Sequence, residues 1–339
     1  MKIAISLAEK RIFNDALIRT GIRRLLKNRL ETLPQEAMTS ADWITSLKDQ
    51  PLAEKTEAAN EQHYEIPSDY FKKVLGPNLK YSCGYWLEDC NSLEASEVRM
   101  LEMTCQRAEL KNGQKILELG CGWGSLSLWM AQKYPQSTIT AVSNSHSQRK
   151  YIEEQARVRR ICNLKVITCD INHFQPDALY DRIVSVEMFE HVRNHQALFR
   201  RIEGWLEQTG KLFVHVFAHR ESTYLFEANK ASDWMSRYFF SGGIMPAADL
   251  LPTAAKGILK TEGIWKINGT HYSKTLEAWL QKQDTAEPVI LDILRLCYGE
   301  SAPLWLQRWR MFYMASSELF AYRNGEEWIV MHYLFSKSS

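Results

Sequence analysis

The sequence predicts an α/β fold built on a doubly wound parallel sheet, with an N-terminal helical arm and a helical cap insertion. Two observations predict it. A glycine-rich turn, E-L-G-C-G-W-G at 118–124, joins a short apolar strand to an amphipathic helix that begins near Ser125. After this turn, strand-like and helix-like segments alternate as far as K-L-F-V-H-V-F at 211–217, which is the order of repeated βαβ units.

The N-terminal segment predicts a basic amphipathic helix. The first thirty residues contain eight Lys or Arg against Glu9 and Asp15. Apolar residues recur at helical spacing: Leu17, Ile18, Ile22, Leu25, Leu26 and Leu30. Three explanations are open: a helix packed on the body, a membrane-surface or targeting helix, and an oligomer contact. Residues 31–60 are typical of polar helix and connector.

The glycine turn predicts a ligand site at the carboxyl ends of the strands. Gly120, Gly122 and Gly124 allow a sharp turn and a close approach of a ligand to the backbone. In a doubly wound sheet, ligands bind beyond the strand ends. Glu118 precedes the first glycine and can reach an ammonium group, which favours S-adenosylmethionine over a dinucleotide.

Two further polar residues follow predicted strands. Ser143 ends S-T-I-T-A-V-S and Asp170 ends L-K-V-I-T-C-D. At the ligand edge of the sheet, such residues are candidates for ribose and adenine contacts. A helix N-cap is the alternative for Asp170.

The stretch V-E-M-F-E-H at 186–191 follows the fourth predicted strand. Glu187, Glu190 and His191 stand at i, i+3 and i+4, so a helix beginning here would carry all three on one face. At a strand end facing a methyl donor, two acids and a base indicate proton transfer. A solvated surface helix is the alternative, and for His191 so is a structural histidine bonded to backbone.

Composition excludes several classes of protein. A formal net charge of +2 argues against a general nucleic-acid binder. The seven cysteines show no CxxC pair and no metal-finger spacing, so we expect reduced thiols and no metal. There is no apolar run of about 20 residues and no signal-peptide core, so we expect a cytoplasmic protein.

Several motifs, taken in order, resemble the cyclopropane fatty acid synthase superfamily. They are Y-E-I-P-S-D-Y-F (64–71), L-K-Y-S-C-G-Y-W (79–86), E-L-G-C-G-W-G, S-N-S-H-S-Q (143–148), F-E-H and H-Y-S-K-T-L-E-A-W (271–279). E-M-F-E-H, D-A-L-I-R-T-G-I-R (15–23) and the tail W-R-M-F-Y-M-A-S-S-E-L-F-A-Y-R-N-G-E-E-W (309–328) are similar, more narrowly, to the coclaurine N-methyltransferase branch. The resemblance covers about residues 60–337.

This resemblance implies one catalytic domain with the Rossmann-like fold of class I S-adenosylmethionine-dependent methyltransferases. Its expected parts are an N-terminal arm and lid (1–88), a cofactor-binding core (89–220), a cap and substrate-binding insertion that includes the sixth strand (221–310), and a C-terminal segment completing the sheet (311–339).

The resemblance also implies roles for individual residues. The cofactor residues would be Tyr81, Ser82, Gly120, Gly122, Ser143, Asn144 and Gln148. Glu118 and Gly124 of the glycine turn, with Asp170 and Ile171 after the third strand, are the other candidate cofactor residues. Glu187 would bind a substrate ammonium, with Glu190 and His191 as the base pair. Trp309 and Phe312 match aromatic substrate-pocket positions, and Phe240, in the aromatic insertion after the fifth strand, is a further candidate; a place in the core is the alternative for each ring.

The lipid-modifying branch implies a different use of some of these positions. There a bicarbonate ion serves as base, and its ligands match Cys83, Glu190, His215 and Tyr272. That branch usually has glycine at the position of Glu187, where a carboxylate would crowd and repel a bound anion. We therefore count Cys83, His215 and Tyr272 as candidate substrate-site residues.

The expected function is N-methylation of a small, aromatic or alkaloid-like amine by in-line transfer from S-adenosylmethionine, leaving S-adenosylhomocysteine. The first alternative is bicarbonate-dependent modification of unsaturated lipid chains, which would require membrane contact. The second is a non-catalytic protein that binds S-adenosylmethionine. No nucleic-acid partner is expected, and a homodimer is open.

Overall fold

The computed structural model describes residues 2–33, 38–53, 66–88, 91–227 and 233–337 of the chain. Part of the predicted 31–60 connector and the first two residues of Y-E-I-P-S-D-Y-F lie outside the described residues. A seven-stranded sheet, in the order β3-β2-β1-β4-β5-β9-β8, forms the centre of the fold. Its strands are β1 (Lys115–Leu119), β2 (Thr138–Ser143), β3 (Leu164–Thr168), β4 (Tyr180–Val186), β5 (Leu206–His219), β8 (Leu259–Ile267) and β9 (Trp328–Lys337).

The sheet is doubly wound, as predicted. Strands β1 to β5 pair in parallel, whereas β9 runs antiparallel between β5 and β8. The sixth expected strand is β8, and the C-terminal segment completes the sheet as β9. A two-stranded sheet, β6 (Tyr224–Leu225) with β7 (Ile244–Met245), is an addition that the sequence pattern did not indicate.

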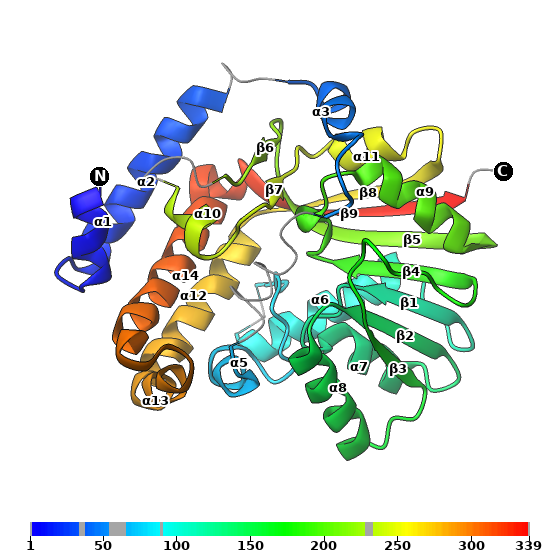
Figure 1. The fold of residues 1–339 in the computed structure, drawn as a ribbon, viewed down its shortest axis with the longest axis horizontal. Helices are drawn as coiled ribbons and strands as arrows, with labels where there is room; N and C mark the ends of the chain where they lie inside the picture. The colour runs from blue at the N-terminus through cyan, green and yellow to red at the C-terminus, as the bar shows by residue number, and fades with distance from the viewer. Residues whose placement is uncertain (1, 34–37, 54–65, 89–90, 228–232, 338–339) are drawn as a thin grey trace.

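Helices cover both faces of the sheet (Figure 1). The helices that pack around it are α6 (Leu93–Arg107), α7 (Ser125–Lys133), α8 (His146–Val158), α9 (His195–Trp205) and α11 (Leu250–Ala255). Side chains alternate between the faces along each strand, because successive residues of a strand point in opposite directions. Leu117 and Val214 pack on the side of α9, whereas Ile116 and Phe213 pack on the side of α6 and α7.

A second group of helices lies beside the sheet. It contains α5 (Ser68–Val74), α10 (Trp234–Tyr238), α12 (Thr270–Thr285), α13 (Glu287–Tyr298) and α14 (Ala302–Gly325). Short 3-10 turns lie at Phe189–His191 and Gly299–Ser301. The expected boundary between 310 and 311 falls inside α14, so the cap and the C-terminal segment share one helix.

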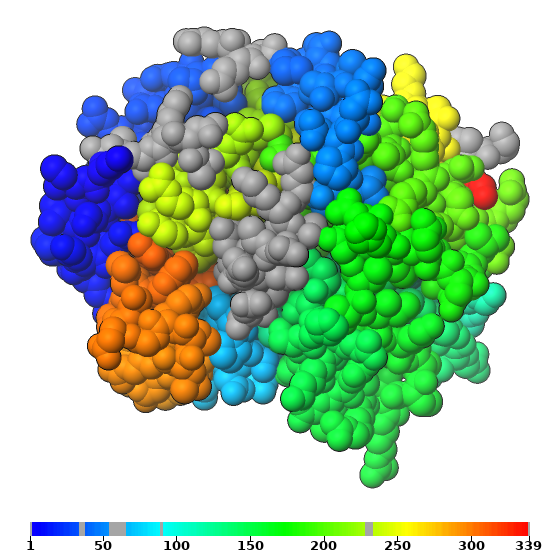
Figure 2. Space-filling view, viewed as in Figure 1, coloured from blue at the N-terminus to red at the C-terminus, as the bar shows by residue number. Residues whose placement is uncertain are grey.

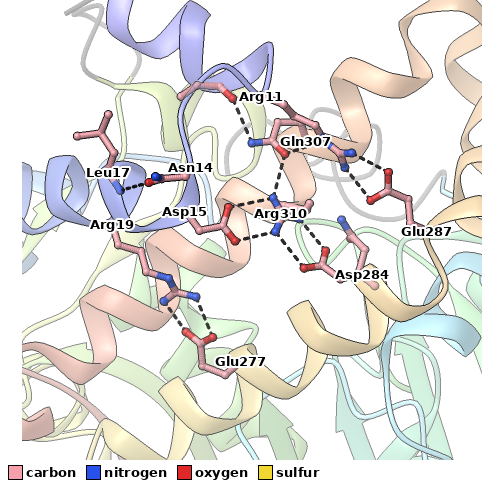
Figure 3. Close-up of polar contacts among 12 residues, drawn as sticks. Arg11, Asn14, Asp15, Leu17, Arg19, Glu277, Asp284, Glu287, Gln307 and Arg310 are labelled. Atoms are coloured by element: carbon pink, nitrogen blue, oxygen red, sulfur yellow. Dashed lines mark hydrogen bonds and ion pairs between the residues drawn. The ribbon is translucent and has the colours of Figure 1, made fainter.

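The N-terminal arm consists of α1 (Lys2–Glu9), α2 (Asp15–Thr32) and α3 (Ser40–Leu47). It packs on the body of the protein, which is the first of its three explanations: α1 and α2 lie against α14 of this helical group, whereas α3 lies against α11 (Figure 2). Figure 3 shows Arg310 of α14 between two carboxylates, Asp15 at 2.8 Å and Asp284 at 2.6 Å. Arg19 contacts Glu277 at 2.7 Å. Arg19 of the arm thus pairs with an acid of α12 and Asp15 of the arm with an arginine of α14, although partly exposed ion pairs of this kind contribute little stability individually.

None of the helices in the described part of the chain combines the length and the apolar character that crossing a bilayer requires.

Candidate active site

A cavity lies at the carboxyl ends of β1, β2 and β4. The predicted cofactor residues that line it are Tyr81, Ser82, Glu118, Gly120, Gly122, Ser143, Asn144, Gln148 and Ile171. Gly124 and Asp170 are not among its lining residues. Gly124 instead begins α7 with φ +79°, and an added Cβ would lie 2.6 Å from Cγ1 of Ile152. Asp170 Oδ1 accepts a hydrogen bond from the N–H of Asn172 at 2.7 Å and so closes a turn after β3, not a helix cap.

The glycine turn leaves room for a ligand against the backbone. Gly120 and Gly122 adopt φ +78° and +50°, in the left-handed region that favours glycine. A Cβ added to Gly122 would meet nothing within 4 Å, so there is open space at this turn. Among the described residues, the buried Ser125 Oγ, Gln148 Nε2 and Trp123 Nε1 have no hydrogen-bond partner. All three residues line the cavity. Buried polar atoms normally have partners, so these groups fit a polar ligand such as S-adenosylmethionine.

Glu118 is a buried carboxyl group in this cavity. It is 2% exposed, and Ser127 Oγ donates a hydrogen bond to it. Burial raises the pKa of Glu118 to about 8, although the Ser127 hydrogen bond favours the charged form. An ammonium group beside this carboxyl would favour its ionised form, which suits the expected contact with the amino end of the cofactor.

Glu118 predicts a pH-dependent stability for the ligand-free protein. Its pKa is about 8 when folded, against an ordinary value of 4.5, so the folded state binds more protons between these values. Its contribution to stability is therefore present at low pH and is lost as pH rises through about 8. Glu118→Gln removes this term, so the melting temperature of the variant relative to wild type should rise between about pH 4.5 and pH 8 and level off above it. A pH-independent difference would contradict this account.

Glu187 follows the end of β4 and points into a ring of donors. Oε1 accepts from the Cys83 N–H at 3.0 Å and lies 3.2 Å from His215 Nε2. Oε2 accepts from the Tyr272 hydroxyl at 2.6 Å. The Glu187 side chain is 9% exposed, and the residue lines the cavity. Three predicted substrate-site residues from separate parts of the chain, Cys83, His215 and Tyr272, thus surround the Glu187 carboxylate. None of the three lines the cavity itself.

The backbone of Glu187 is strained. Its φ is +49°, a conformation that residues other than Gly, Asn and Asp rarely adopt. Such strain costs on the order of 1–3 kcal/mol and persists only where surrounding contacts enforce it. The Glu187 N–H donates to the His215 carbonyl at 2.8 Å, and the carboxylate contacts Cys83, His215 and Tyr272, so both backbone and side chain are held here.

The predicted helix carrying Glu187, Glu190 and His191 on one face is wrong. Only Phe189–His191 form a short 3-10 turn, because the left-handed residue at 187 redirects the chain first. Glu187 and His191 line the cavity, whereas Glu190 does not. Glu190 is fully buried, and its Oε1 accepts from the Phe217 N–H at 2.8 Å.

The two carboxyl groups have different electrostatic environments. Burial, followed by repulsion from Glu187, raises the pKa of Glu190 well above 4.5, which favours its neutral form. Burial also raises the pKa of Glu187, but Lys80, the Tyr272 hydroxyl and the Cys83 N–H favour its charged form. Of the two, Glu187 is therefore the one placed and poised to carry a negative charge at the cavity.

The predicted aromatic residues lie outside the cavity lining. Phe240 packs against His191, with ring centroids 4.8 Å apart. Trp309 is fully buried, and its ring packs against Phe239 and Tyr70 at 4.9 and 5.1 Å. Phe312 stacks on Phe239 at 4.6 Å. The expectation that these rings contact a substrate remains a prediction.

Sequence reasoning missed Lys80, Trp123 and Met188, which also line the cavity. Lys80 is 3% exposed, and its ammonium donates to Ser82 Oγ and to the Cys83 carbonyl. Lys80 lies inside L-K-Y-S-C-G-Y-W, and its position among aromatic and small residues is the sequence feature that could have indicated a cavity residue. Within the described residues, no group of three or more acidic, histidine or cysteine side chains is arranged to hold a metal ion.

Comparison with known proteins gives a consistent result. Residues 52–326 match the model of the mycolic acid cyclopropane synthetase family. The chain is 38% identical over 332 residues to (S)-coclaurine N-methyltransferase of Thalictrum flavum subsp. glaucum, covering 95% of this chain and 90% of the relative. It is 29% identical over 271 residues to cyclopropane-fatty-acyl-phospholipid synthase of Escherichia coli strain K12, covering 76% and 68%.

Solved structures of similar proteins have the same fold as this chain. A coclaurine N-methyltransferase bound to N-methylheliamine and S-adenosylhomocysteine matches with a TM-score of 0.94 and 35% identity, over 98% of this chain and 99% of that one. A mycolic acid cyclopropane synthase complexed with S-adenosylhomocysteine and CTAB has the same fold, with a TM-score of 0.69 at 19% identity, over 84% of this chain and 99% of that one. The chain therefore belongs to the mycolic acid cyclopropane synthetase family, in its coclaurine N-methyltransferase-like branch, and is an S-adenosylmethionine-dependent methyltransferase.

Proposed function

We propose that this enzyme methylates the nitrogen of a small, aromatic or alkaloid-like amine. The observation that carries the proposal is the buried carboxylate of Glu187, held at the cavity by Cys83, His215 and Tyr272. Two similar proteins are named for amine substrates. They are a coclaurine N-methyltransferase, which is 38% identical to this chain, and a pavine N-methyltransferase, which is 32% identical to it.

The chemistry of an amine explains why a carboxylate stands there. An alkylamine has a pKa of about 10.4 and is mostly protonated at neutral pH, so its lone pair is occupied. The cofactor, when bound, supplies an electrophilic methyl group. Glu187 has about four lone-pair positions, of which its three partners fill three. The remaining position can accept from the substrate ammonium, and the carboxylate then takes its proton.

Two neighbours of Glu187 favour its ionised form, which is the form that binds the substrate ammonium before the proton moves. His191 lines the same cavity, and its charged form favours the ionised form of Glu187. The buried Lys80, when charged, acts in the same direction, although burial lowers its pKa. We assign the base role to Glu187 and not to Glu190, because Glu190 does not line the cavity and burial raises its pKa well above the ordinary value, which favours its neutral form. Proton transfer by a positioned group typically contributes about 10²–10⁴-fold in rate.

The lipid alternative requires a bicarbonate ion at the residues that here surround Glu187. The Tyr272 hydroxyl and His215 Nε2 already contact the Glu187 carboxylate. A second anion at this place would meet a like charge in a buried site, which is unfavourable. The geometry therefore favours the amine substrate, with the carboxylate built into the chain.

A paired substrate assay tests the proposal. Purified enzyme with methyl-labelled S-adenosylmethionine is given a panel of cyclic aromatic amines, including the amine that corresponds to N-methylheliamine, and separately vesicles of unsaturated phospholipid with bicarbonate. We expect label in the amines and none above background in lipid. Label that appears in lipid alone would overturn the amine proposal.

A further inference from the structure

Three side chains stand in one row across the antiparallel part of the sheet. His215 of β5 is paired with His332 of β9, and His332 with Trp265 of β8. Directly opposed residues project from the same face of a sheet. Arg107, the last residue of α6, lies over this row, with its guanidinium carbon 5.1 Å from the centroid of the Trp265 ring.

Hydrogen bonds connect this row to Glu187. Arg107 Nη1 lies 2.9 Å from His332 Nδ1, and His332 Nε2 lies 2.8 Å from His215 Nδ1. His215 Nε2 in turn lies 3.2 Å from Glu187 Oε1. The four groups thus form one chain from the outer end of α6 to the active site.

The direction of each hydrogen bond in this series follows from the Arg107 guanidinium. A guanidinium has only donors, so Arg107 must donate and His332 Nδ1 must accept. A neutral His332 then carries its proton on Nε2 and donates to His215 Nδ1. His215 in turn carries its proton on Nε2 and donates to Glu187 Oε1. Both imidazoles are fully buried, and burial lowers the pKa of each well below 6.5, so each carries one proton at neutral pH.

We infer that Arg107 is a remote positioning residue that fixes the tautomers of His332 and His215, so that an N–H always faces the Glu187 carboxylate. This inference deepens the proposed function, since it concerns the same carboxylate. This series of hydrogen bonds holds the histidine tautomers fixed but cannot carry a proton away from Glu187, because a guanidinium cannot accept a proton arriving from His332. A proton taken up by Glu187 therefore leaves through the cavity.

Nuclear magnetic resonance of protein labelled with ¹⁵N-histidine tests the tautomers of His215 and His332 without any substrate. We expect both His215 and His332 to show the Nε2–H tautomer in the wild type, assigned through His215→Gln and His332→Gln. In Arg107→Met, the His332 signals should move to the Nδ1–H tautomer or to a mixture. An Nδ1–H or imidazolium form of His332 in the wild type would overturn the inference outright.

Kinetics supply the second test. Arg107→Met keeps an apolar stem over Trp265 but removes the donor, so kcat/KM for the amine should fall about ten- to hundredfold, the effect of one hydrogen bond to a charged group. Affinity for S-adenosylhomocysteine should stay within about twofold, since Arg107 does not line the cavity. Arg107→Lys keeps a cationic donor and should recover most of the loss. Unchanged kcat/KM in Arg107→Met would contradict the inference.

Arg182→Met is the matched control. Arg182 is another mostly buried arginine near the end of α6, where its Nε donates to the Ala108 carbonyl at 3.1 Å without touching a histidine. Its loss should affect stability but neither the histidine tautomers nor kcat/KM. If wild type fails to methylate any amine, the proposed function fails, while the tautomer spectra still decide whether Arg107 sets the histidines.

Discussion

Replacing Glu187 by glutamine is expected to lower kcat/KM for amine methylation by about 10²–10⁴-fold at neutral pH. Glutamine keeps the shape of the side chain: its oxygen can accept from the Cys83 N–H and His215, and its amide can donate to the Tyr272 hydroxyl. The variant therefore removes the negative charge and the base while leaving the hydrogen bonds intact. Steady-state kinetics with the best amine from the substrate panel measure the effect.

The control for this substitution is Glu327→Gln. Glu327 is also a buried glutamate beside a histidine, with Oε1 3.1 Å from His219 Nε2, but it does not line the cavity. Its loss should change stability and leave kcat/KM within a few-fold. Binding of S-adenosylhomocysteine should be retained in both variants. Amine turnover by Glu187→Gln at the wild-type rate would show that another group takes the proton.

Replacing Trp309 by alanine is expected to lower the free energy of unfolding by about 3–5 kcal/mol. Trp309 is fully buried on α14 and packs against Tyr70, Phe71 and Phe239 with ring centroids 4.9–6.4 Å apart. Truncation removes this contact area and leaves a cavity that the surrounding rings fill only in part. Urea denaturation, followed by tryptophan fluorescence and circular dichroism, measures the loss.

The same variant decides the role that the sequence suggested for this ring. Trp305, one helical turn earlier on α14, is only half-buried and stacks on Tyr298 at 4.5 Å, so Trp305→Ala should cost less stability. A Trp309→Ala protein with unchanged stability but a much higher KM for the amine would show that Trp309 is a substrate contact and not a core residue.

The parts of the fold that could be predicted are those with local signals. The strand before Gly120, the turn through Gly124 and the helix from Ser125 are adjacent in sequence, and each obeys a short-range rule of spacing or backbone conformation. Most of the cofactor side of the cavity follows from these elements, because the carboxyl ends of parallel strands meet at one edge.

The acid–base side of the site could be predicted only in part. The spacing of Glu187, Glu190 and His191 suggested a shared helix face, but a left-handed residue at 187 sends Glu190 away from the cavity. Local spacing cannot reveal this conformation, because contacts with distant segments enforce it. Tyr272 is 85 residues from Glu187 along the chain. Likewise, no local pattern could join Arg107 to His332, which is 225 residues away.

A crystal structure of the enzyme with S-adenosylhomocysteine and an accepted amine would show which group holds the reacting nitrogen. We expect the amine nitrogen within about 2.6–3.2 Å of a Glu187 carboxylate oxygen, on the side of the cofactor sulfur. A nitrogen bound at another group, with Glu187 contacting only Cys83, His215 and Tyr272, would contradict it.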